Sequence, residues 1–398
     1  MSNFHAALEI GTSRTVLAAG EMRKDGTLEI TCHAEIPSTG VRKSQILSIG
    51  QATQSIRSVL KEIERNQIKN GLSLTVGNAF LVVSGPQIQV DTAEPSVPIA
   101  RRSVTEEDIE ALARVARTIA LPRERELLDI IDRSYSVDEL SGIIDPKGHD
   151  GRVLKLDVFH IHTNAQLVND ARTAAGEAKL ELRDPLFAAT CAADAVLSEQ
   201  DRRSGTLVLD LGGGSTGYAA YCDSVLAATG TIGVGGDHVT NDIATAFQTT
   251  NAMAEELKKR ESSAVFTQGR GERVPFPGAT PLLENRTISR RALETVVNAR
   301  MREIANMIRE RLEEADLLHR LHGGIVLTGG GAALDGLDTL LKREFGVPVK
   351  IGIPENVVGL PEGKAAASFA AIAGALMYAH RNYEEKTLFD SLFGGIFK

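Results

Sequence analysis

Apolar positions along the chain follow two different periods, which predict a succession of strands and helices. Compact apolar runs predict buried strands over 6–10, 15–19, 80–84, 206–211, 218–221 and 324–328. Apolar residues spaced three and four apart predict helices over 44–65, 166–178, 185–197, 238–247, 252–261, 289–316 and 365–381. This alternation of strands and helices is typical of an α/β protein.

The segment after Ser84 has the pattern of a small unit of its own. Pro95 and Pro98 interrupt the periodicity and indicate a boundary. The stretch Ser103-Val-Thr-Glu106 has the form of a capping box, which predicts a helix start. Strands are expected over 127–137 and 153–161, with a turn between them. Residues 159–163 are then expected to return the chain to the first unit.

Length and charge limit the classes of function. The chain has 398 residues, enough for two or three domains of roughly 100–200 residues each. A net charge of -8 disfavours a broad nucleic-acid-binding surface, and an anionic membrane would repel the protein as a whole. Any membrane contact therefore requires a specific membrane-binding segment. We expect neither a signal peptide nor a membrane span, and we expect Cys32, Cys191 and Cys222 to be reduced core thiols.

Three glycine-rich turns, each following a predicted strand, carry the strongest chemical signal. Glu9-Ile-Gly11-Thr12-Ser13 joins two strands near the N-terminus. The layout recurs as Asp210-Leu-Gly212-Gly213-Gly214-Ser215-Thr216, and Thr328-Gly329-Gly330-Gly331 closes a later strand. Two of the turns are therefore expected to form matching hairpins.

The residue types in these turns suit a bound polyphosphate. Glycine lets the backbone approach phosphate and point its N–H groups at the oxygens. The hydroxyls of Thr12, Ser13, Ser215 and Thr216 add short donors. A carboxylate such as Glu9 or Asp210 cannot contact phosphate favourably, but it can hold Mg²⁺ through water. Two facing loops could then clamp a triphosphate from opposite sides.

The three turns together resemble the nucleotide site of the actin, Hsp70 and sugar-kinase superfamily. The resemblance to the FtsA family of bacterial cell-division proteins is closer and spans nearly the whole body of the chain. The segments that carry it are Leu8-Glu-Ile-Gly-Thr-Ser13, Val83-Ser-Gly85, Val104-Thr-Glu-Glu-Asp108, Val208-Leu-Asp-Leu-Gly-Gly-Gly-Ser215, Gly233-Val-Gly-Gly-Asp-His-Val-Thr240, Gly324-Ile-Val-Leu-Thr-Gly-Gly330 and Val349-Lys-Ile-Gly352.

This resemblance implies an α/β, actin-like, two-lobed ATPase fold with an inserted FtsA-type subdomain and a C-terminal amphipathic helix. The first lobe would comprise 1–84 and 160–204, completed by 365–381, and the inserted subdomain would be 85–159. The second lobe would comprise 205–251 and 302–364, with an insert of its own at 252–301. Residues 382–398 would form a short linker and a membrane-targeting tail.

The family also implies ATP and Mg²⁺ as ligands. Carried over to this sequence, phosphates would be held by Gly11, Thr12, Ser13, Gly212, Gly213, Gly214, Ser215 and Thr216, with Glu9 and Asp210 on Mg²⁺. The nucleoside would lie against Gly235, Gly236, Gly329, Gly330 and Gly331. Glu255 and Lys258, or Lys259, on a charged helix could reach the ribose.

The partners implied are FtsZ, further copies of the chain in a filament, membrane lipid and other division proteins, with no nucleic acid. The chain would act at the division site, on the cytoplasmic face of the membrane. The resemblance assigns the FtsZ contact to the second lobe's insert, within about 252–301.

One departure from the family pattern concerns ATP hydrolysis. The family often has an acidic residue two positions after the hydroxyl of the second hairpin, where this chain has Gly217. Glycine cannot orient or deprotonate a water. Asp194 lies where related proteins present a water-orienting polar side chain, and we expect it to compensate or to be an ordinary helix residue. The sequence therefore predicts good nucleotide binding with slow hydrolysis, assigning catalytic roles to Asp194 and Asp210.

The last residues have the pattern of an amphipathic helix. At helical spacing one half of its surface is apolar, formed by Leu388, Phe389, Leu392, Phe393, Ile396 and Phe397. Such a face can insert into a lipid interface, and many tails on one filament would bind together. The alternative is that the helix docks on its own body or on a partner protein.

Two other readings stay open from the sequence. One is a relative of PilM, the pilus-assembly protein with the same actin-like core, which would not need the apolar tail. The other is a small-molecule kinase or chaperone ATPase of the same superfamily, for which neither a clear base nor a long substrate domain is found. His160 and His162 would share one face of a strand, but two histidines without further ligands predict no metal site.

Overall fold

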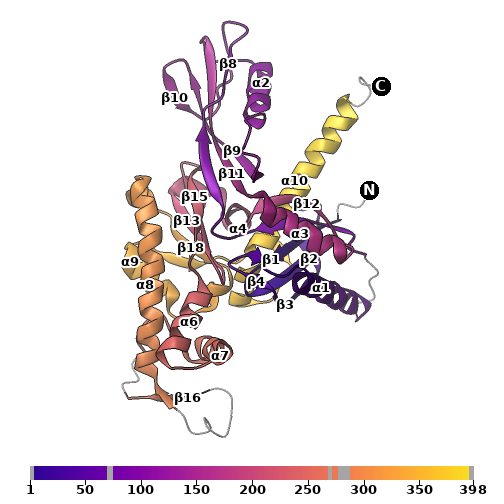
Figure 1. Cartoon of the computed structure of the whole chain (residues 1–398). Coiled ribbons are helices and arrows are strands. Elements are labelled where there is room, and N and C mark those ends of the chain that lie inside the picture. Colours follow the sequence, from indigo (N-terminus) through magenta and orange to yellow (C-terminus); the bar gives the residue numbers. More distant parts are fainter. Residues whose placement is uncertain (1–3, 70–74, 268–270, 277–286, 394–398) are drawn as a thin grey trace.

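A computed structural model of the chain describes residues 4–69, 75–267, 271–276 and 287–393. Two α/β lobes lie side by side, a smaller subdomain extends from them, and the last helix projects from the body (Figure 1). There are three hydrophobic cores: one is centred on the first lobe and also includes buried residues of the second lobe's sheet, one lies in the second lobe, and one lies in the inserted subdomain. The predicted two-lobed α/β architecture with an inserted subdomain is confirmed.

The first lobe is built on a six-stranded sheet of order β12-β6-β1-β2-β3-β20. Its strands are β1 (Phe4–Ile10), β2 (Arg14–Met22), β3 (Leu28–Pro37), β6 (Asn78–Val83), β12 (Glu181–Phe187) and β20 (Val357–Val358). Its helices are α1 (Ile49–Lys69), α3 (Ala165–Glu177), α4 (Ala188–Val196) and α10 (Ala370–Phe393). Strands β1, β2 and β3 are antiparallel neighbours, whereas β6 and β12 run parallel to β1.

The second lobe repeats this topology in the order β15-β14-β13-β18-β19. Its strands are β13 (Thr206–Leu211), β14 (Thr216–Cys222), β15 (Val225–Ile232), β18 (Gly324–Thr328) and β19 (Val349–Ile351). Its helices are α5 (Glu199–Ser204), α6 (Gly236–Ala246), α7 (Asn251–Glu261), α8 (Arg290–Glu314) and α9 (Leu337–Phe345). A short hairpin pairs β16 (Arg273–Pro275) with β17 (Thr287–Ser289). The repeat places β1–β2 and β13–β14 in equivalent positions of the two lobes.

The inserted subdomain is a sheet of order β10-β9-β11-β7 covered by one helix. Its elements are β7 (Gln89–Ala93), β8 (Ser96–Pro98), α2 (Glu106–Arg117), β9 (Arg125–Val137), β10 (Leu140–Ile143) and β11 (Val153–Asn164). The capping box exists but lies two residues later than predicted, because Thr105 and Asp108 cap each other reciprocally. Strand β11 pairs with β7 as far as His162 and with β9 as far as Asn164, both beyond the expected boundary at Phe159.

Two predicted elements differ from those observed, and one observed strand was not predicted. The helix expected from Ser44 begins at Ile49, because β4 (Val41–Arg42) and β5 (Gln45–Ile46) form a hairpin before it. The helix expected over 185–197 is divided into the end of β12 and α4. Strand β3 was missed. By contrast, Ser289 caps α8 as predicted, and the apolar stripe of α8 is buried.

The C-terminal helix also differs from the expected helix, linker and tail. A 3-10 turn, η3 (Gly363–Phe369), leads directly into α10, which runs without a break from Ala370 to Phe393. The predicted linker, 382–387, is thus part of this helix. It contains neither glycine nor proline to interrupt one. Among the described residues no helix is both long enough and apolar enough to cross a membrane.

Candidate functional site

The two predicted hairpin turns have the same backbone geometry. In the first, the N–H of Gly11 donates to the carbonyl of Arg14 at 3.0 Å. In the second, the N–H of Gly212 donates to the carbonyl of Ser215, also at 3.0 Å. Each turn closes an antiparallel strand pair, β1–β2 in the first lobe and β13–β14 in the second. The turns therefore occupy equivalent positions at the cleft edges of the two lobes.

Both turns open onto one cavity of about 490 Å³ between the lobes. The third glycine turn, which passes into a 3-10 turn η2 (Gly330–Ala333), borders the same cavity. The predicted residues that line it are Glu9, Gly11, Thr12, Ser13, Asp210, Gly212, Gly213, Gly214, Ser215, Gly236, Glu255, Lys258, Gly329, Gly330 and Gly331. Segments far apart in the sequence are thus brought together as the sequence predicts.

The two hairpins approach each other so closely that a side chain would not fit between them. A Cβ on Gly214 would lie 2.5 Å from the hydroxyl of Thr12 and 2.9 Å from the Cα of Lys43. That hydroxyl accepts a hydrogen bond from the N–H of Ser44 at 2.8 Å. The β4–β5 hairpin therefore holds Thr12 in place against the opposite lobe, and glycine at 214 permits the contact.

Glu9 and Asp210 end equivalent strands and face the cavity from opposite lobes. Burial raises the pKa of Glu9 to about 7; Arg14 opposes the shift and Asp210 adds to it. Burial also raises the pKa of Asp210 to about 6, again opposed by Arg14. Burial makes it costly for both carboxylates to be negatively charged at once. A hard divalent cation between them would offset that cost. The residues present therefore fit Mg²⁺.

The strand register places each carboxylate in a row of three directly opposed residues. In the first lobe Glu9 lies opposite Val16, which lies opposite Glu35 on β3. In the second lobe Asp210 lies opposite Gly217, which lies opposite Thr231 on β15. Directly opposed residues in antiparallel strands point to the same face of the sheet. Gly217 is thus the position beside Asp210 where a side chain could reach the cavity.

Helix α4 occupies the space next to Gly217. A Cβ on this glycine would lie 3.0 Å from the Cβ of Ala189. The position therefore lacks a polar side chain and has little room for one. Besides Asp210, the polar neighbour in its row is Thr231, which lines the cavity and donates to the carbonyl of Thr216 at 3.3 Å.

A charged cluster on α7 borders the other end of the cavity. Lys258 pairs with Glu255 at 2.6 Å and donates to the carbonyl of Gly236 at 3.0 Å. Burial opposes ionisation of Glu255, but its pairs with Lys258 and Lys259 outweigh that effect and hold its pKa below the ordinary value. The ion pairs and the hydrogen bond therefore hold these side chains in place at the edge of the cavity.

Two predicted site residues support the cavity without lining it. Thr216 is buried, and its hydroxyl donates to the carbonyl of Val234 at 2.8 Å, so it is not free to contact phosphate. Gly235 lies behind the second hairpin, where a Cβ would be 2.6 Å from the carbonyl oxygen of Gly212. Both positions shape the hairpin from outside.

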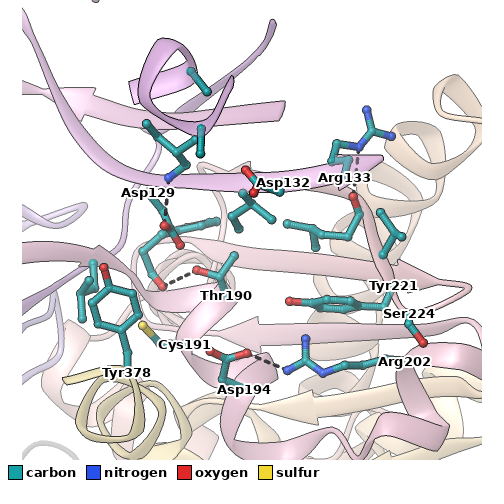
Figure 2. A pocket seen from close by; sticks show the side chains of 18 of the residues that line it. Asp129, Asp132, Arg133, Thr190, Cys191, Asp194, Arg202, Tyr221, Ser224 and Tyr378 are labelled. Atoms are coloured by element: carbon teal, nitrogen blue, oxygen red, sulfur yellow. Dashed lines mark hydrogen bonds and ion pairs between the residues drawn. The ribbon is translucent and has the colours of Figure 1, made fainter. Parts of the chain in front are cut away.

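Asp194 is the clear misplacement among the predicted site residues. It lies outside the cavity between the glycine turns and borders a second one, of about 570 Å³, between the insert and both lobes. Figure 2 shows it facing Arg202. Its carboxylate pairs with Arg202 at 2.7 Å and with Arg381 at 2.5 Å. Helix α4 does border the cavity between the glycine turns, through Ala188 and Ala189, but the side chain of Asp194 points away from that cavity. The prediction of a catalytic role for Asp194 was therefore wrong.

The two strand histidines, His160 and His162, are held by hydrogen bonds. In His162, Nδ1 accepts from Arg125 at 2.8 Å and Nε2 lies 2.9 Å from Asp91. In His160, Nε2 lies 3.2 Å from the carbonyl of Ala116. The described residues contain no group of three or more histidines, cysteines or acidic residues that could hold a metal ion. The three cysteines are buried and unpaired.

Several cavity residues were not predicted. Arg14 directly follows the first glycine turn, and Asp237 directly follows Gly236, so position next to a motif could have indicated both. The others come from elements whose placement the sequence does not reveal; they include Glu35, Ser44, Ser84, Met301, Leu334, Asp335 and Lys364.

The predicted tail is only partly described. Leu388, Phe389, Leu392 and Phe393 fall on the last turns of α10, while Ile396 and Phe397 lie outside the described residues. Figure 1 shows this end of α10 extending away from both lobes.

Two family models match the chain. The model described as "Cell division protein FtsA" matches residues 207–374, which begin at the second hairpin strand and end in α10. The model described as "SHS2 domain inserted in FTSA" matches residues 85–162. The second match covers the subdomain that the structure shows between β6 and α3.

Known proteins match along almost the full length. Cell division protein FtsA of Pseudomonas aeruginosa is 30% identical over 374 residues, covering 93% of this chain and 88% of that protein. The protein of the same name from Escherichia coli K12 is 30% identical over 388 residues, covering 94% and 90%. The one from Bacillus subtilis is 26% identical over 383 residues, covering 96% and 84%.

Solved structures share the fold at low sequence identity. The PilM–PilN type IV pilus biogenesis complex matches with a TM-score of 0.67 and 19% identity, covering 94% of this chain and 98% of that one. MreB 5 of Spiroplasma citri bound to AMPPNP matches with a TM-score of 0.52 and 16% identity, over the whole of both chains. These likenesses identify the two-lobed fold as actin-like.

Proposed function

Because this chain belongs to the FtsA family of cell division proteins, we propose that it binds ATP with Mg²⁺ in the cavity between its lobes. It would assemble into actin-like filaments and tether the FtsZ ring to the cytoplasmic face of the membrane at the division site. The observation that carries the nucleotide proposal is the pair of equivalent hairpins that face each other across one cavity, with a third glycine turn at its border.

The chemistry of the cavity divides it into two ends. At one end the backbone N–H groups and hydroxyls around Thr12, Ser13 and Gly213–Ser215 would hold phosphate oxygens. Glu9 and Asp210 would repel a polyphosphate unless a cation lay between, so they would hold Mg²⁺, which neutralises phosphate charge when bound. That the MreB 5 structure of the same fold is bound to AMPPNP supports this proposal.

At the other end the nucleoside would lie between α7 and the third turn. Gly236 and Gly329–Gly331 leave room for a base and ribose, and Glu255 with Lys258 would contact the ribose hydroxyls. The carboxylate of Glu255 is ionised and held by two lysines, so it is a ready acceptor.

Calorimetry with MgATP tests the nucleotide site. The wild-type chain should bind, and Gly214→Val should abolish binding, because its side chain would occupy the space of Thr12 and Lys43. Gly176→Ala, on α3 with open space around it, is the matched control and should bind as the wild type does. Absence of heat with correctly folded wild-type protein would contradict the proposal.

The membrane and FtsZ roles depend on different surfaces. The projecting end of α10 carries the apolar residues predicted to insert into lipid, and the region around α7, β16–β17 and the start of α8 would meet FtsZ. Electron microscopy on a lipid monolayer with ATP should show filaments, and these should recruit FtsZ to the monolayer. A chain that forms filaments but leaves FtsZ in solution would contradict the tether.

The two alternative readings have less support. The PilM likeness, at 19% identity, extends to the fold alone, whereas the division proteins match the chain at 30% identity. A small-molecule kinase needs a base beside the transferred phosphate, and the position next to Asp210 is Gly217, packed against Ala189. The division-protein function therefore accounts for the observations best.

A further inference from the structure

We propose that Arg14 is a positioning residue of the nucleotide site, a fixed cation that lets phosphate approach Glu9 and Asp210 and fastens the first hairpin to the nucleoside turn. The inference rests on the proposed nucleotide binding. Arg14 lies one residue beyond Ser13, where the first segment that resembles the family ends.

The register of the first lobe places Arg14 among carboxylates. Arg14 precedes Val16 by two residues on β2, so the two side chains point to the same face of the sheet. Val16 lies opposite Glu9 on one side and Glu35 on the other, which makes Arg14 the diagonal neighbour of both. Its guanidinium pairs with Glu35 and lines the cavity. Its charge also acts on Glu9 and on Asp210 across the cleft.

A second set of contacts holds the guanidinium in place from the opposite direction. Nη2 donates to the carbonyl of Ser368 on η3 at 2.5 Å, and the guanidinium lies 5.2 Å from the ring centre of Phe369. The preceding carbonyl of η3, that of Ala367, accepts from the N–H of Gly329 at 3.0 Å. Arg14 thus connects the first glycine hairpin to the third glycine turn, at Gly329, through two neighbouring residues of η3.

The second lobe shows that the hairpin itself does not require a cation. Ser215 closes the second turn as Arg14 closes the first, and it is neutral. The other cations that line the cavity in the described part of the chain are already engaged elsewhere. Lys258 and Lys259 pair with Glu255, and Lys364 lies 3.7 Å from Asp335. Arg14, although it pairs with Glu35, is the one of these cavity-lining cations that lies diagonal to Glu9 in the strand register.

A comparison of ADP affinity with Mg²⁺ and with EDTA tests this role. A fixed cation and Mg²⁺ both offset the two carboxylates, so loss of the fixed one should matter most when Mg²⁺ is absent. Arg14→Gln should weaken ADP binding at least tenfold in EDTA and threefold or less in Mg²⁺. Arg14→Lys, which keeps the charge, should restore most of the metal-free affinity. Glu35→Gln removes a competing carboxylate and should leave metal-free binding unchanged or tighter.

The control is Arg23→Gln, which breaks an exposed Arg–Glu pair, to Glu29, at the other end of the same strand pair. It should leave both affinities unchanged. Equal weakening of Arg14→Gln in EDTA and in Mg²⁺ would show a merely structural role and overturn the proposal, as would no weakening at all. If Arg14→Gln does not fold, a tenfold metal-free loss in the folded Arg14→Lys protein would also overturn it. A wild-type chain that binds no ADP with Mg²⁺ would instead refute the proposed function.

Discussion

Asp194 of α4 pairs with Arg381 of α10 at 2.5 Å, on the segment of that helix that leads out of the body. The other carboxylate oxygen of Asp194 pairs with Arg202 of α5 at 2.7 Å. The Arg202 guanidinium lies 4.3 Å from the ring centre of Tyr221 on β14, the second strand of the second glycine hairpin. One carboxylate therefore connects the helix that carries the tail with the lobe that carries the second hairpin.

Replacement of Asp194 should affect stability and leave nucleotide binding unchanged. Asp194→Asn removes the charge that both arginines share, and Arg202 is largely buried, so we expect a loss of about 1–3 kcal/mol in the free energy of unfolding. Arg381→Gln should cost less, about 1 kcal/mol or below, because Arg381 is mostly exposed. Chemical unfolding and MgATP calorimetry measure the two effects. A large drop in ATP affinity for Asp194→Asn would show instead that Asp194 acts on the nucleotide site.

The nucleotide-free protein should lose stability as pH rises from about 5 to 8. Burial raises the pKa of Glu9 from 4.5 to about 7 and that of Asp210 from 3.8 to about 6. The folded state therefore holds protons that the unfolded state has released, and this advantage is lost as pH passes the folded values. Glu9→Gln stays neutral, so it should be more stable than the wild type at pH 8 by roughly 2 kcal/mol and similar at pH 5.

The measurement for this pH effect is urea unfolding at several pH values. Glu64→Gln, on the exposed side of α1, serves as the control and should follow the wild type. Parallel curves for wild type and Glu9→Gln across this range would contradict the assignment of a raised pKa to Glu9.

ATP bound to the wild-type chain should be hydrolysed slowly, because Gly217 leaves no carboxylate beside Asp210. Gly217→Asp combined with Ala189→Gly introduces the carboxylate and clears the nearest atom, which is 3.0 Å away. We expect single-turnover phosphate release to rise about a hundredfold, the lower end of the range for general base catalysis. Gly217→Asn with the same Ala189→Gly change has the shape without the charge and should stay slow. Fast release by the wild type would refute the prediction.

Membrane attachment should depend on the apolar residues at the end of α10. A chain ending at Arg381 should no longer sediment with lipid vesicles in the presence of MgATP. Leu388→Ser with Leu392→Ser, within the full chain, should reduce sedimentation strongly, because each buried leucine contributes roughly 1.5–3 kcal/mol. Asp390→Ser, on the polar side of the predicted helix, is the matched control. Equal sedimentation of the truncated and full chains would mean that the tail is no anchor.

The lengths of apolar runs were enough to predict most elements, since burial of one face imposes a period on local sequence. Strands β1, β13 and β18, helix α8 and its cap Ser289 follow from that rule. Strand β3 was missed and the helix over 185–197 was drawn too long. Pro185 allows either element, and pairing of β12 with β6 decides the outcome at that point.

The glycine turns, their carboxylates and the apolar tail were determined by the sequence alone, because each depends on neighbouring residues and on backbone freedom at glycine. Only the tertiary structure decided which side chains meet in the cleft. In the structure Arg14 and Glu35 lie in the same cavity as Glu9, Asp194 borders a different cavity, and Ala189 lies against Gly217. Those contacts join different strands and helices, so they depend on strand register and helix orientation, which local periodicity does not encode.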